Sequence, residues 1–296
     1  MRAFEAVGRT GSVIDAARDL RMSQASVSTQ VRTVEVNAQS QLFLRKGKRF
    51  ELTAFGERVF QRICTVLSLV DDLDLLLDSH RTLDSGILRI GYSADQFAMP
   101  LIAEFAARYP GIKIEARSMA SHDLLQRLDN NLAELAMITA TAPPEGYHSV
   151  MLRRDRVVLM VPSGHKLLAL PQPIPWQALQ GLPIIRRESS SGTREIFERA
   201  ANAAGVQLVS MLEVGSWGSM AQAVSAGISI GIALEGELQD QPGLHAVRID
   251  DPTLFARHYL VTPEKMQTIT TVAAFFDTAA SYNLRGTSTL RAIRQD

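Results

Sequence analysis

The sequence predicts a multidomain α+β fold with three parts: a small helical unit at residues 1–53, a long connector helix at 54–83, and a two-lobed α/β unit at 86–296. Three observations predict this division. Short amphipathic helical patterns and a basic turn fill the first part, an apolar repeat fills the second, and strands alternate with helices in the third. With 296 residues, 46% of them hydrophobic and 21% charged, the chain has room for two or three domains with a real core.

Two helices joined by a tight turn are predicted between residues 13 and 34. Ser23 stands as the N-cap of the second helix, and Val27, Val31 and Val34 recur at spacings of four and three, which makes a buried face. The opposite side of that helix carries small or polar side chains: Gln24, Ala25, Ser28, Thr29 and Arg32. Two helices in this arrangement are typical of a helix-turn-helix, whose second helix enters the major groove of DNA.

A basic cluster follows this pair of helices. Arg45-Lys46-Gly47-Lys48-Arg49 lies between Leu42-Phe43 and residues 50–53, and its glycine predicts a turn between two short strands, a wing that can lie along phosphates. Although the whole chain has no net charge, residues 1–53 carry nine Lys and Arg against five Asp and Glu, a net of +4. A polyanion partner is therefore expected for this segment alone.

An apolar repeat marks residues 57–85, where neither Pro nor Gly interrupts the pattern. The repeat places side chains at alternating spacings of four and three on one narrow seam of a helix: Val59, Ile63, Val66, Val70, Leu73 and Leu77. Such a seam is buried either by docking on a globular domain or by self-association. Because the chain changes character on both sides of the helix, a self-associating connector helix is the favoured interpretation.

Short apolar strands alternate with helices after residue 86, which indicates a parallel sheet with helical crossovers. The strands predicted for the first unit are 87–91, 112–116, 135–138 and 157–161. A second α/β unit runs from 182 to 234, and a strand at 257–261 returns the chain to the first unit. Two lobes, about 86–160 with 262–296 and about 161–261, then form a cleft as in periplasmic binding proteins.

Several groups in the N-terminal segment match one family in residue type and spacing: Gly11-Ser12, Ala16-Ala17, Leu20, Ser23-Gln24-Ala25-Ser26-Val27-Ser28, Glu35, Leu42-Phe43, Arg45 and Leu52-Thr53. Through them the segment resembles the winged helix-turn-helix of LysR-type transcriptional regulators. The resemblance implies that bases are read by Gln24, Ala25, Ser28 and Thr29. It also implies that phosphates are held by Ser23, Arg32, Arg45, Lys46, Arg49 and Thr53.

The segment departs from the family pattern at two positions. The family usually has Pro where Ala25 opens the recognition helix and Gly where Gln39 ends it. The chain also starts directly at the first helix, without a few residues that most members have.

The resemblance extends, less specifically, to about residue 283. Gly86-Ile87-Leu88-Arg89-Ile90-Gly91, Tyr109-Pro110-Gly111 and Gly227-Ile228-Ser229-Ile230-Gly231 look like the effector-sensing domain of the family. It implies a sequence-specific DNA-binding regulator that forms a homodimer to homotetramer, with promoter DNA and a small effector as partners and RNA polymerase as a further candidate. A cytoplasmic location is expected, since the first residues begin a helix rather than a signal peptide and no apolar run reaches about 18 residues.

Loops at the carboxyl ends of the predicted strands are where such sheets bind ligands. Hydroxyl groups and backbone N–H groups at the helix starts there favour a small anion. The residues predicted to hold it are Ser93, Ser121, Ser191, Thr193 and Ser216. Each of them taken alone is also explained as a helix N-cap. The stretch 187–194 and the start at residues 1–4 look somewhat like LysR-type regulators associated with aminoethylphosphonate catabolism.

Patterns for an enzyme or a metal protein were tested against the same sequence. Residues 227–231 match G-x-S-x-G, but the order here is helix, turn and strand, whereas a nucleophile elbow needs a strand before the serine and a helix after it. The six histidines lack metal-ligand spacing and the single cysteine, Cys64, excludes an internal disulfide. We therefore expect no catalytic residues, no metal and no cofactor. The remaining alternative is a small-molecule binding protein whose basic N-terminus anchors it to a surface.

Overall fold

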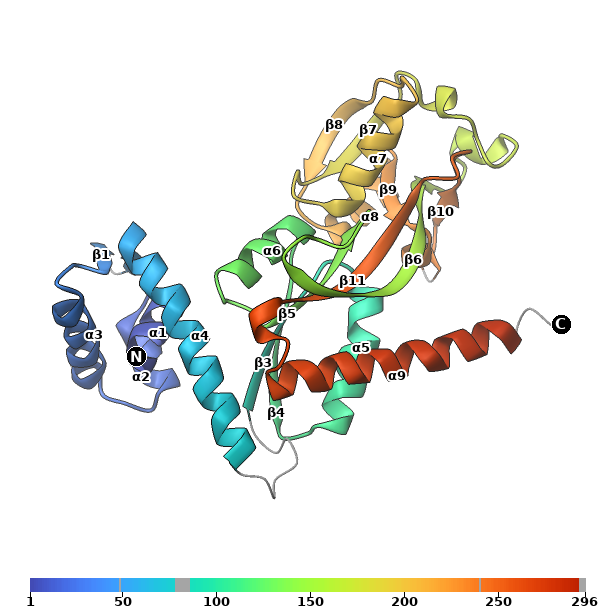
Figure 1. Cartoon of the computed structure of the whole chain (residues 1–296). Coiled ribbons are helices and arrows are strands. Elements are labelled where there is room, and N and C mark those ends of the chain that lie inside the picture. The colour runs from blue at the N-terminus through green and yellow to red at the C-terminus, as the bar shows by residue number, and fades with distance from the viewer. Residues whose placement is uncertain (48, 78–85, 240, 293–296) are drawn as a thin grey trace.

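The computed structural model describes residues 1–47, 49–77, 86–239 and 241–292 of the chain. A small helical head, one long helix and a two-lobed α/β unit follow one another along the chain (Figure 1). The long helix lies between the head and the first lobe. In the part of the chain that the structure describes, none of the helices is long and apolar enough to cross a membrane.

The head contains three helices and a hairpin: α1 (Arg2–Thr10), α2 (Val13–Asp19), α3 (Gln24–Ala38), β1 (Phe43–Lys46) and β2 (Arg49–Leu52). Its core is built around Phe4, with the ring of Phe43 at 5.0 Å between centroids. The predicted buried face of α3 is present, because Val27 and Val31 lie in this core and Val34 packs against it. Residues 43–52 form the predicted antiparallel wing.

Helix α4 (Ala54–Leu77) divides its apolar seam between two environments. Near its start, Ile63 is buried in the core of the head and Val59 packs against that core. Farther along, Val66, Val70 and Leu73 are 43%, 42% and 52% exposed. The first part of the seam thus docks on the head, as one of the two interpretations expected, whereas self-association through the exposed valines and Leu73 stays a prediction. The expectation for residues 78–85 lies outside the described residues.

The first lobe follows the predicted alternation. Its elements are β3 (Gly86–Tyr92), α5 (Asp95–Arg108), β4 (Ile112–Ser118), α6 (Ser121–Asp129), β5 (Leu135–Ala140), and the C-terminal helix α9 (Thr270–Ala292), which is preceded by the short turn η4 (Glu264–Met266). Strand β3 pairs in parallel with both β4 and β5. This arrangement brings the carboxyl ends of the three strands to one edge of the sheet.

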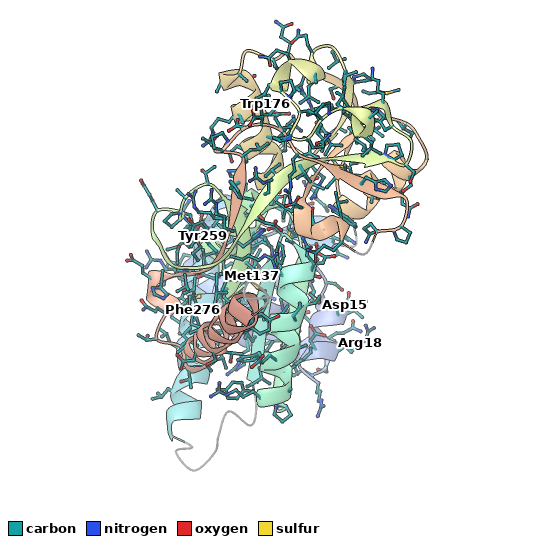
Figure 2. The ribbon with its side chains drawn as sticks, turned by 90° about the vertical axis from the view of Figure 1, so that its right-hand side faces the viewer. Asp15, Arg18, Met137, Trp176, Tyr259 and Phe276 are labelled. Atoms are coloured by element: carbon teal, nitrogen blue, oxygen red, sulfur yellow. The ribbon has the colours of Figure 1, made fainter. Side chains whose placement is uncertain are left out.

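Two long strands connect the lobes: β6 (Tyr147–Pro162) and β11 (Phe255–Pro263), which pair antiparallel. One sheet therefore continues through both lobes, in the order β10-β6-β11-β5-β3-β4 with β9 beside β6. The second lobe adds η1 (Lys166–Ala169), η2 (Trp176–Leu179), β7 (Pro183–Arg187), α7 (Gly192–Ala203), β8 (Val209–Val214), α8 (Trp217–Ser225), β9 (Gly231–Leu234), η3 (Glu235–Leu238) and β10 (Leu244–Val247). Figure 2 shows Trp176 in this lobe, and Met137 and Tyr259 in the first.

The crossing strands differ from the sequence prediction. Strand β6 has 16 residues, whereas only 157–161 was predicted, and β10 was not predicted at all. The part of β6 that was not predicted contains Arg153, Arg154 and Arg156, and these charged residues interrupt the apolar pattern of a strand. This part is a strand because residues 147–156 of β6 pair with the whole of β11.

Candidate functional site

The first candidate site is the outer surface of α3. The Ser23 hydroxyl accepts the Ser26 N–H at 3.1 Å and caps the helix, so the helix begins at the predicted residue. The residues predicted to contact DNA from this helix are all exposed: Ser23, Gln24, Ala25, Ser28, Thr29 and Arg32. The buried valines on the other face hold the helix against the head, and its polar face is open to a partner.

The end of α3 shows how the chain accommodates its departure from the family pattern. Gln39 has a φ of 48°, in the left-handed region that favours glycine. The helix nevertheless ends in the usual way, with the Ser40 N–H donating to Glu35 O at 3.2 Å. The left-handed conformation costs about 1 kcal/mol for a non-glycine residue. The Glu35 carboxylate also accepts the N–H groups of Leu42 and Phe43, which orders the segment after the helix.

The wing presents the predicted basic side chains to solvent. Arg45, Lys46 and Arg49 are exposed on the hairpin, and Gly47 takes the positive φ of 63° that its turn requires. Lys46 is paired with Glu51 at 2.7 Å. Thr53 uses its hydroxyl to accept the Gly56 N–H at 2.9 Å, at the start of α4. Arg45 Nε donates to Gly47 O at 3.4 Å within the turn. The exposure of Arg45, Lys46 and Arg49 leaves these described cations of the wing open to solvent.

The second candidate site lies where the two lobes meet, around Thr139 at the carboxyl end of β5. The Ser93 and Thr139 hydroxyl oxygens are 3.0 Å apart. The Ser121 hydroxyl accepts the Thr139 N–H at 3.0 Å. From the other lobe, α7 approaches so closely that a Cβ on Gly192 would stand 2.0 Å from Thr139 O. The structure thus brings Ser93, Ser121 and the start of α7 together around one residue.

The remaining predicted effector residues lie at the same helix starts in the second lobe. Ser191 is buried and caps α7 by accepting the Arg194 N–H at 3.4 Å, and Thr193 is half-buried in its first turn. Ser216 is exposed and caps α8, where it accepts the Ser219 N–H at 3.1 Å. Both hydroxyl groups therefore act as N-caps in this arrangement of the lobes. Because β7 and β8 run in parallel, the two helix starts lie at one edge of their sheet.

Three residues at this junction were not predicted: Thr139, His258 and Phe97. The buried His258 Nδ1 lies 3.2 Å from the Thr139 hydroxyl, and its ring lies against Phe97 with centroids 4.4 Å apart. Burial, helped by the nearby charge of Arg153, lowers the pKa of His258 to about 3, so its imidazole is neutral. Thr139 lies at the carboxyl end of β5, the kind of position from which the serines were predicted, so the same reasoning could have found it. His258 lies within the antiparallel strand β11, and its position in the sequence gives no such signal.

Direct hydrogen bonds also join the lobes beside Thr139. The His122 N–H donates to Ser190 O at 3.2 Å, and the Ser190 hydroxyl donates to Asp123 Oδ2 at 3.1 Å. Ser190 belongs to the loop before α7, whereas His122 and Asp123 begin α6. Among the described residues, no group of His, Cys, Asp and Glu could hold a metal ion.

A helix-turn-helix head joined by a long helix to a two-lobed α/β unit defines a class of DNA-binding transcriptional regulators. Residues 1–57 match the family model described as bacterial regulatory helix-turn-helix protein, lysR family, and residues 81–283 match the LysR substrate binding domain. The chain belongs to the LysR family of transcriptional regulators. This assignment supports a DNA-binding regulator over a small-molecule binding protein that is merely anchored to a surface.

Individual relatives agree with the family assignment. The chain is 31% identical to the HTH-type transcriptional regulator CbbR of Rhodospirillum rubrum, over 78% of this chain and 77% of CbbR. It is 29% identical to the transcriptional activator CmpR of Synechocystis, over 79% of each. Full-length OxyR from Pseudomonas aeruginosa has the same fold, with a TM-score of 0.76, 16% identity, and coverage of 94% of this chain and 92% of OxyR.

The effector unit has a solved counterpart with a ligand. The regulatory domain of CcmR from Synechocystis, in complex with 2-PG, has a TM-score of 0.61 and 25% identity to this chain. The match covers 67% of this chain and 98% of the CcmR domain.

Proposed function

We propose that this regulator reads DNA with the start of α3 and holds the phosphate backbone with its flanks and its wing. Bases are contacted by Gln24, Ala25, Ser28 and Thr29, and phosphates by Ser23, Arg32, Arg45, Lys46, Arg49 and Thr53. The observation that carries this assignment is the fully exposed polar face of α3, whose opposite face is buried in the head. The net positive charge of residues 1–53 supports it, because phosphate contacts dominate affinity for DNA.

The effector of the proposed site is a small anion bound between the lobes. The predicted ligands Ser93, Ser121, Ser191, Thr193 and Ser216 stand at helix starts, where free N–H groups and the helix dipole favour negative charge. The 2-PG complex of the similar CcmR domain supports a ligand site in this kind of unit. An association with aminoethylphosphonate catabolism stays a prediction from the sequence alone.

The division of the chain and its assembly belong to the same proposal. The head spans residues 1–53, the connector 54–83 and the effector unit 86–296, and the exposed half of the seam on α4 supports pairing of two connector helices. The chain then forms a homodimer to homotetramer that acts on promoter DNA in the cytoplasm, with RNA polymerase as a candidate partner. It has no catalytic activity of its own, in keeping with relatives named as transcriptional regulators.

The test of DNA reading begins with selection of binding sites from random duplexes by the full chain, followed by gel retardation of the selected and a scrambled duplex. Gln24→Ala should cost about 1–3 kcal/mol on the selected site and little on scrambled DNA, because it removes a base contact. Arg45→Ala should weaken binding to both duplexes and reduce the slope of log affinity against log salt by about one unit.

Arg154→Ala provides the control, because it removes an exposed arginine of β6 in the effector unit. It should change neither the affinity nor the salt slope. If Gln24→Ala and Arg45→Ala weaken binding to selected and scrambled DNA by the same factor, the assigned roles are wrong.

A further inference from the structure

The two ends of helix α6 make contacts in different parts of the molecule. At its start, the Ser121 hydroxyl accepts the Thr139 N–H in the proposed effector site. The next two residues contact the second lobe through Ser190, whose carbonyl accepts the His122 N–H and whose hydroxyl donates to Asp123. The beginning of α6 therefore contacts both the proposed effector site and the second lobe.

The loop after α6 contacts the connector helix α4. Gln61 Nε2 donates to Asn130 Oδ1 at 2.6 Å, and Asn131 Nδ2 donates to the Gln61 carbonyl at 2.9 Å. Leu132 packs against the hydrophobic core of the head. Asn131 has a φ of 52°, a left-handed conformation that aims its buried amide at the connector helix. Residues 130–132 thus attach the effector unit to the head and its connector.

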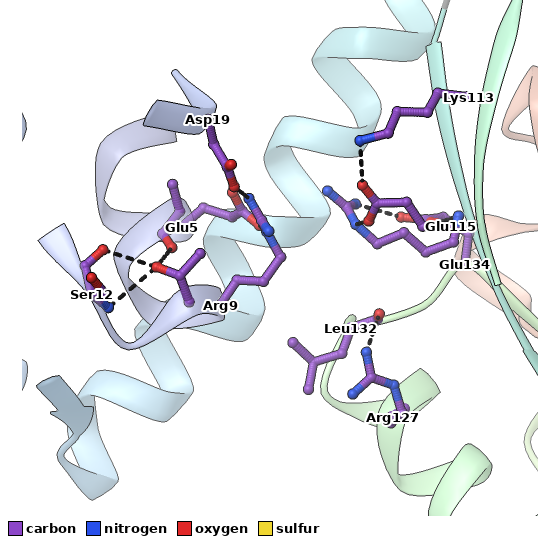
Figure 3. A network of polar contacts seen from close by, with 12 residues as sticks. Glu5, Arg9, Ser12, Asp19, Lys113, Glu115, Arg127, Leu132 and Glu134 are labelled. Carbon is purple, nitrogen blue, oxygen red and sulfur yellow. Dashed lines mark hydrogen bonds and ion pairs between the residues drawn. The ribbon is translucent and has the colours of Figure 1, made fainter. Parts of the chain in front are cut away.

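The same boundary contains a cavity of about 970 Å³, and Figure 3 shows the charged side chains of its two walls. On the head, Arg9 is paired with Glu5 at 3.1 Å and with Asp19 at 2.8 Å. On the first lobe, Arg89 is paired with Glu134 at 3.1 Å. Each of these ion pairs stays within its own wall, so it persists when the walls separate. The hydrogen bonds at residues 130–132, in contrast, cross the boundary, so movement of the head would break them.

We propose that α6 is a mechanical coupler, which transmits movement of the second lobe to the connector helix and hence to the DNA-reading head. A helix of nine residues is about 14 Å long and moves as one body, because its backbone hydrogen bonds are internal. Leu124 and Leu128 are fully buried and guide it along the sheet of the first lobe. The proposal rests on the proposed function, since an effector must shift the lobes for the coupler to have a signal.

Cys64 offers a native reporter of the far end of the coupler. It is the single cysteine of the sequence, it lies on α4 one turn after Gln61, and it lines the cavity together with Arg89, Asn131 and Glu134. Burial raises the pKa of its thiol to about 12, so its reaction with a disulfide reagent such as DTNB reports opening of this boundary. No DNA and no effector are needed for the measurement.

Two variants of the full chain perturb the opposite ends of α6. Gln61→Ala removes the side-chain bond to Asn130 and should increase the DTNB reaction rate about fivefold, the change expected for one net hydrogen bond. Ser190→Asp places a carboxylate against Asp123 in the other lobe, at the far end of the helix. If α6 transmits the resulting displacement, this variant should also increase the rate, by at least about twofold.

Each variant has a matched control. Gln126→Ala makes the same chemical change at an exposed position of α6, and Ser189→Asp adds the same charge one residue before Ser190, where the side chain is exposed. Both should react at the wild-type rate. Urea unfolding of every variant separates opening of the boundary from a general loss of stability, because opening through one lost hydrogen bond should lower the free energy of unfolding by no more than about 1 kcal/mol.

Two results would overturn the proposal. If Gln61→Ala accelerates the reaction and Ser190→Asp does not, residues 130–132 hold the head but α6 carries no signal. If neither variant accelerates the reaction, the contact does not control the boundary at all. The DNA-binding roles are tested by gel retardation and the coupler by the DTNB reaction rate. A contradiction of one proposal is therefore distinguishable from a contradiction of the other.

Discussion

At the scale of single residues, the junction of the lobes is organised by Thr139. Its hydroxyl lies within hydrogen-bonding distance of Ser93 and His258, its N–H donates to Ser121, and its carbonyl faces the backbone of Gly192. All four neighbours come from different elements, so a ligand that displaces one of them changes the contacts of the others.

The neutral state of His258 leads to a pH prediction. Its pKa of about 3 in the folded protein is below the unfolded value of about 6.5, so protonation favours unfolding as the pH falls below about 6.5. Between pH 7.5 and pH 5 this residue alone should cost about 2 kcal/mol of stability. His258→Asn has no titrating group, and its amide can still reach Thr139.

Urea unfolding at the two pH values checks this prediction. The loss of stability from pH 7.5 to pH 5 should be smaller in His258→Asn than in the wild type by about 2 kcal/mol. Equal losses in the two proteins would mean that His258 is not held neutral by burial.

At the scale of elements, α4 combines two roles along one seam. Its first half completes the core of the head, and its second half exposes Val66, Val70 and Leu73 to solvent. Apolar side chains in a row on one helix face are most readily covered by the same face of a second copy.

Charge on this exposed half should therefore weaken assembly. The double substitution Val66→Glu with Val70→Glu should raise the dissociation constant of the dimer at least tenfold, because burial of each valine contributes about 1.5 kcal/mol or more. Sedimentation equilibrium measures the constant. Arg62→Glu, at an exposed position of the same helix, changes the charge by as much and should have little effect. An unchanged constant in the double variant would exclude the seam from the interface.

At the scale of the whole molecule, the two lobes are connected by continuous strands and meet again at the starts of α6 and α7. The crossing strands β6 and β11 form a two-stranded connection, and the contact of Gly192 with Thr139 limits how closely the lobes approach. If the proposed effector binds between the lobes, we expect it to act by changing the separation of the lobes at this contact.

Gly192→Ala tests this contact. The added methyl group would collide with Thr139 O, so the lobes must separate, at a cost of about 1–3 kcal/mol. A thermal-shift screen of phosphonates, phosphates, carboxylates and sulfonates on the full chain first finds the anion that stabilises the wild type most. The variant should respond to that anion more weakly.

Gly218→Ala is the matched control, because a Cβ at this second position of α8 meets open space. It should respond to the anion as the wild type does. A full response in Gly192→Ala would show that closure at Gly192 is not part of effector binding, and a wild type that responds to none of the anions would contradict the proposed effector class.

Much of the architecture follows from the sequence because its causes are local. The cap at Ser23, the valine face of α3 and the glycine turn of the wing depend on residues a few positions apart, and the structure confirms each of them. Local sequence also identified each serine as the start of a helix. Whether these serines come together in one site depends on the fold. A 16-residue β6 could not be predicted, since its charged half is a strand only through pairing with β11.

The sequence by itself determined the DNA-reading head, the connector and the alternation of strands and helices, since hydrophobic periodicity and capping act between near neighbours along the chain. Only the tertiary structure decided that Thr139 meets His258, 119 residues away, and that Gln61 meets Asn131, 70 residues away. Such contacts depend on how whole elements pack, and no local pattern encodes that packing.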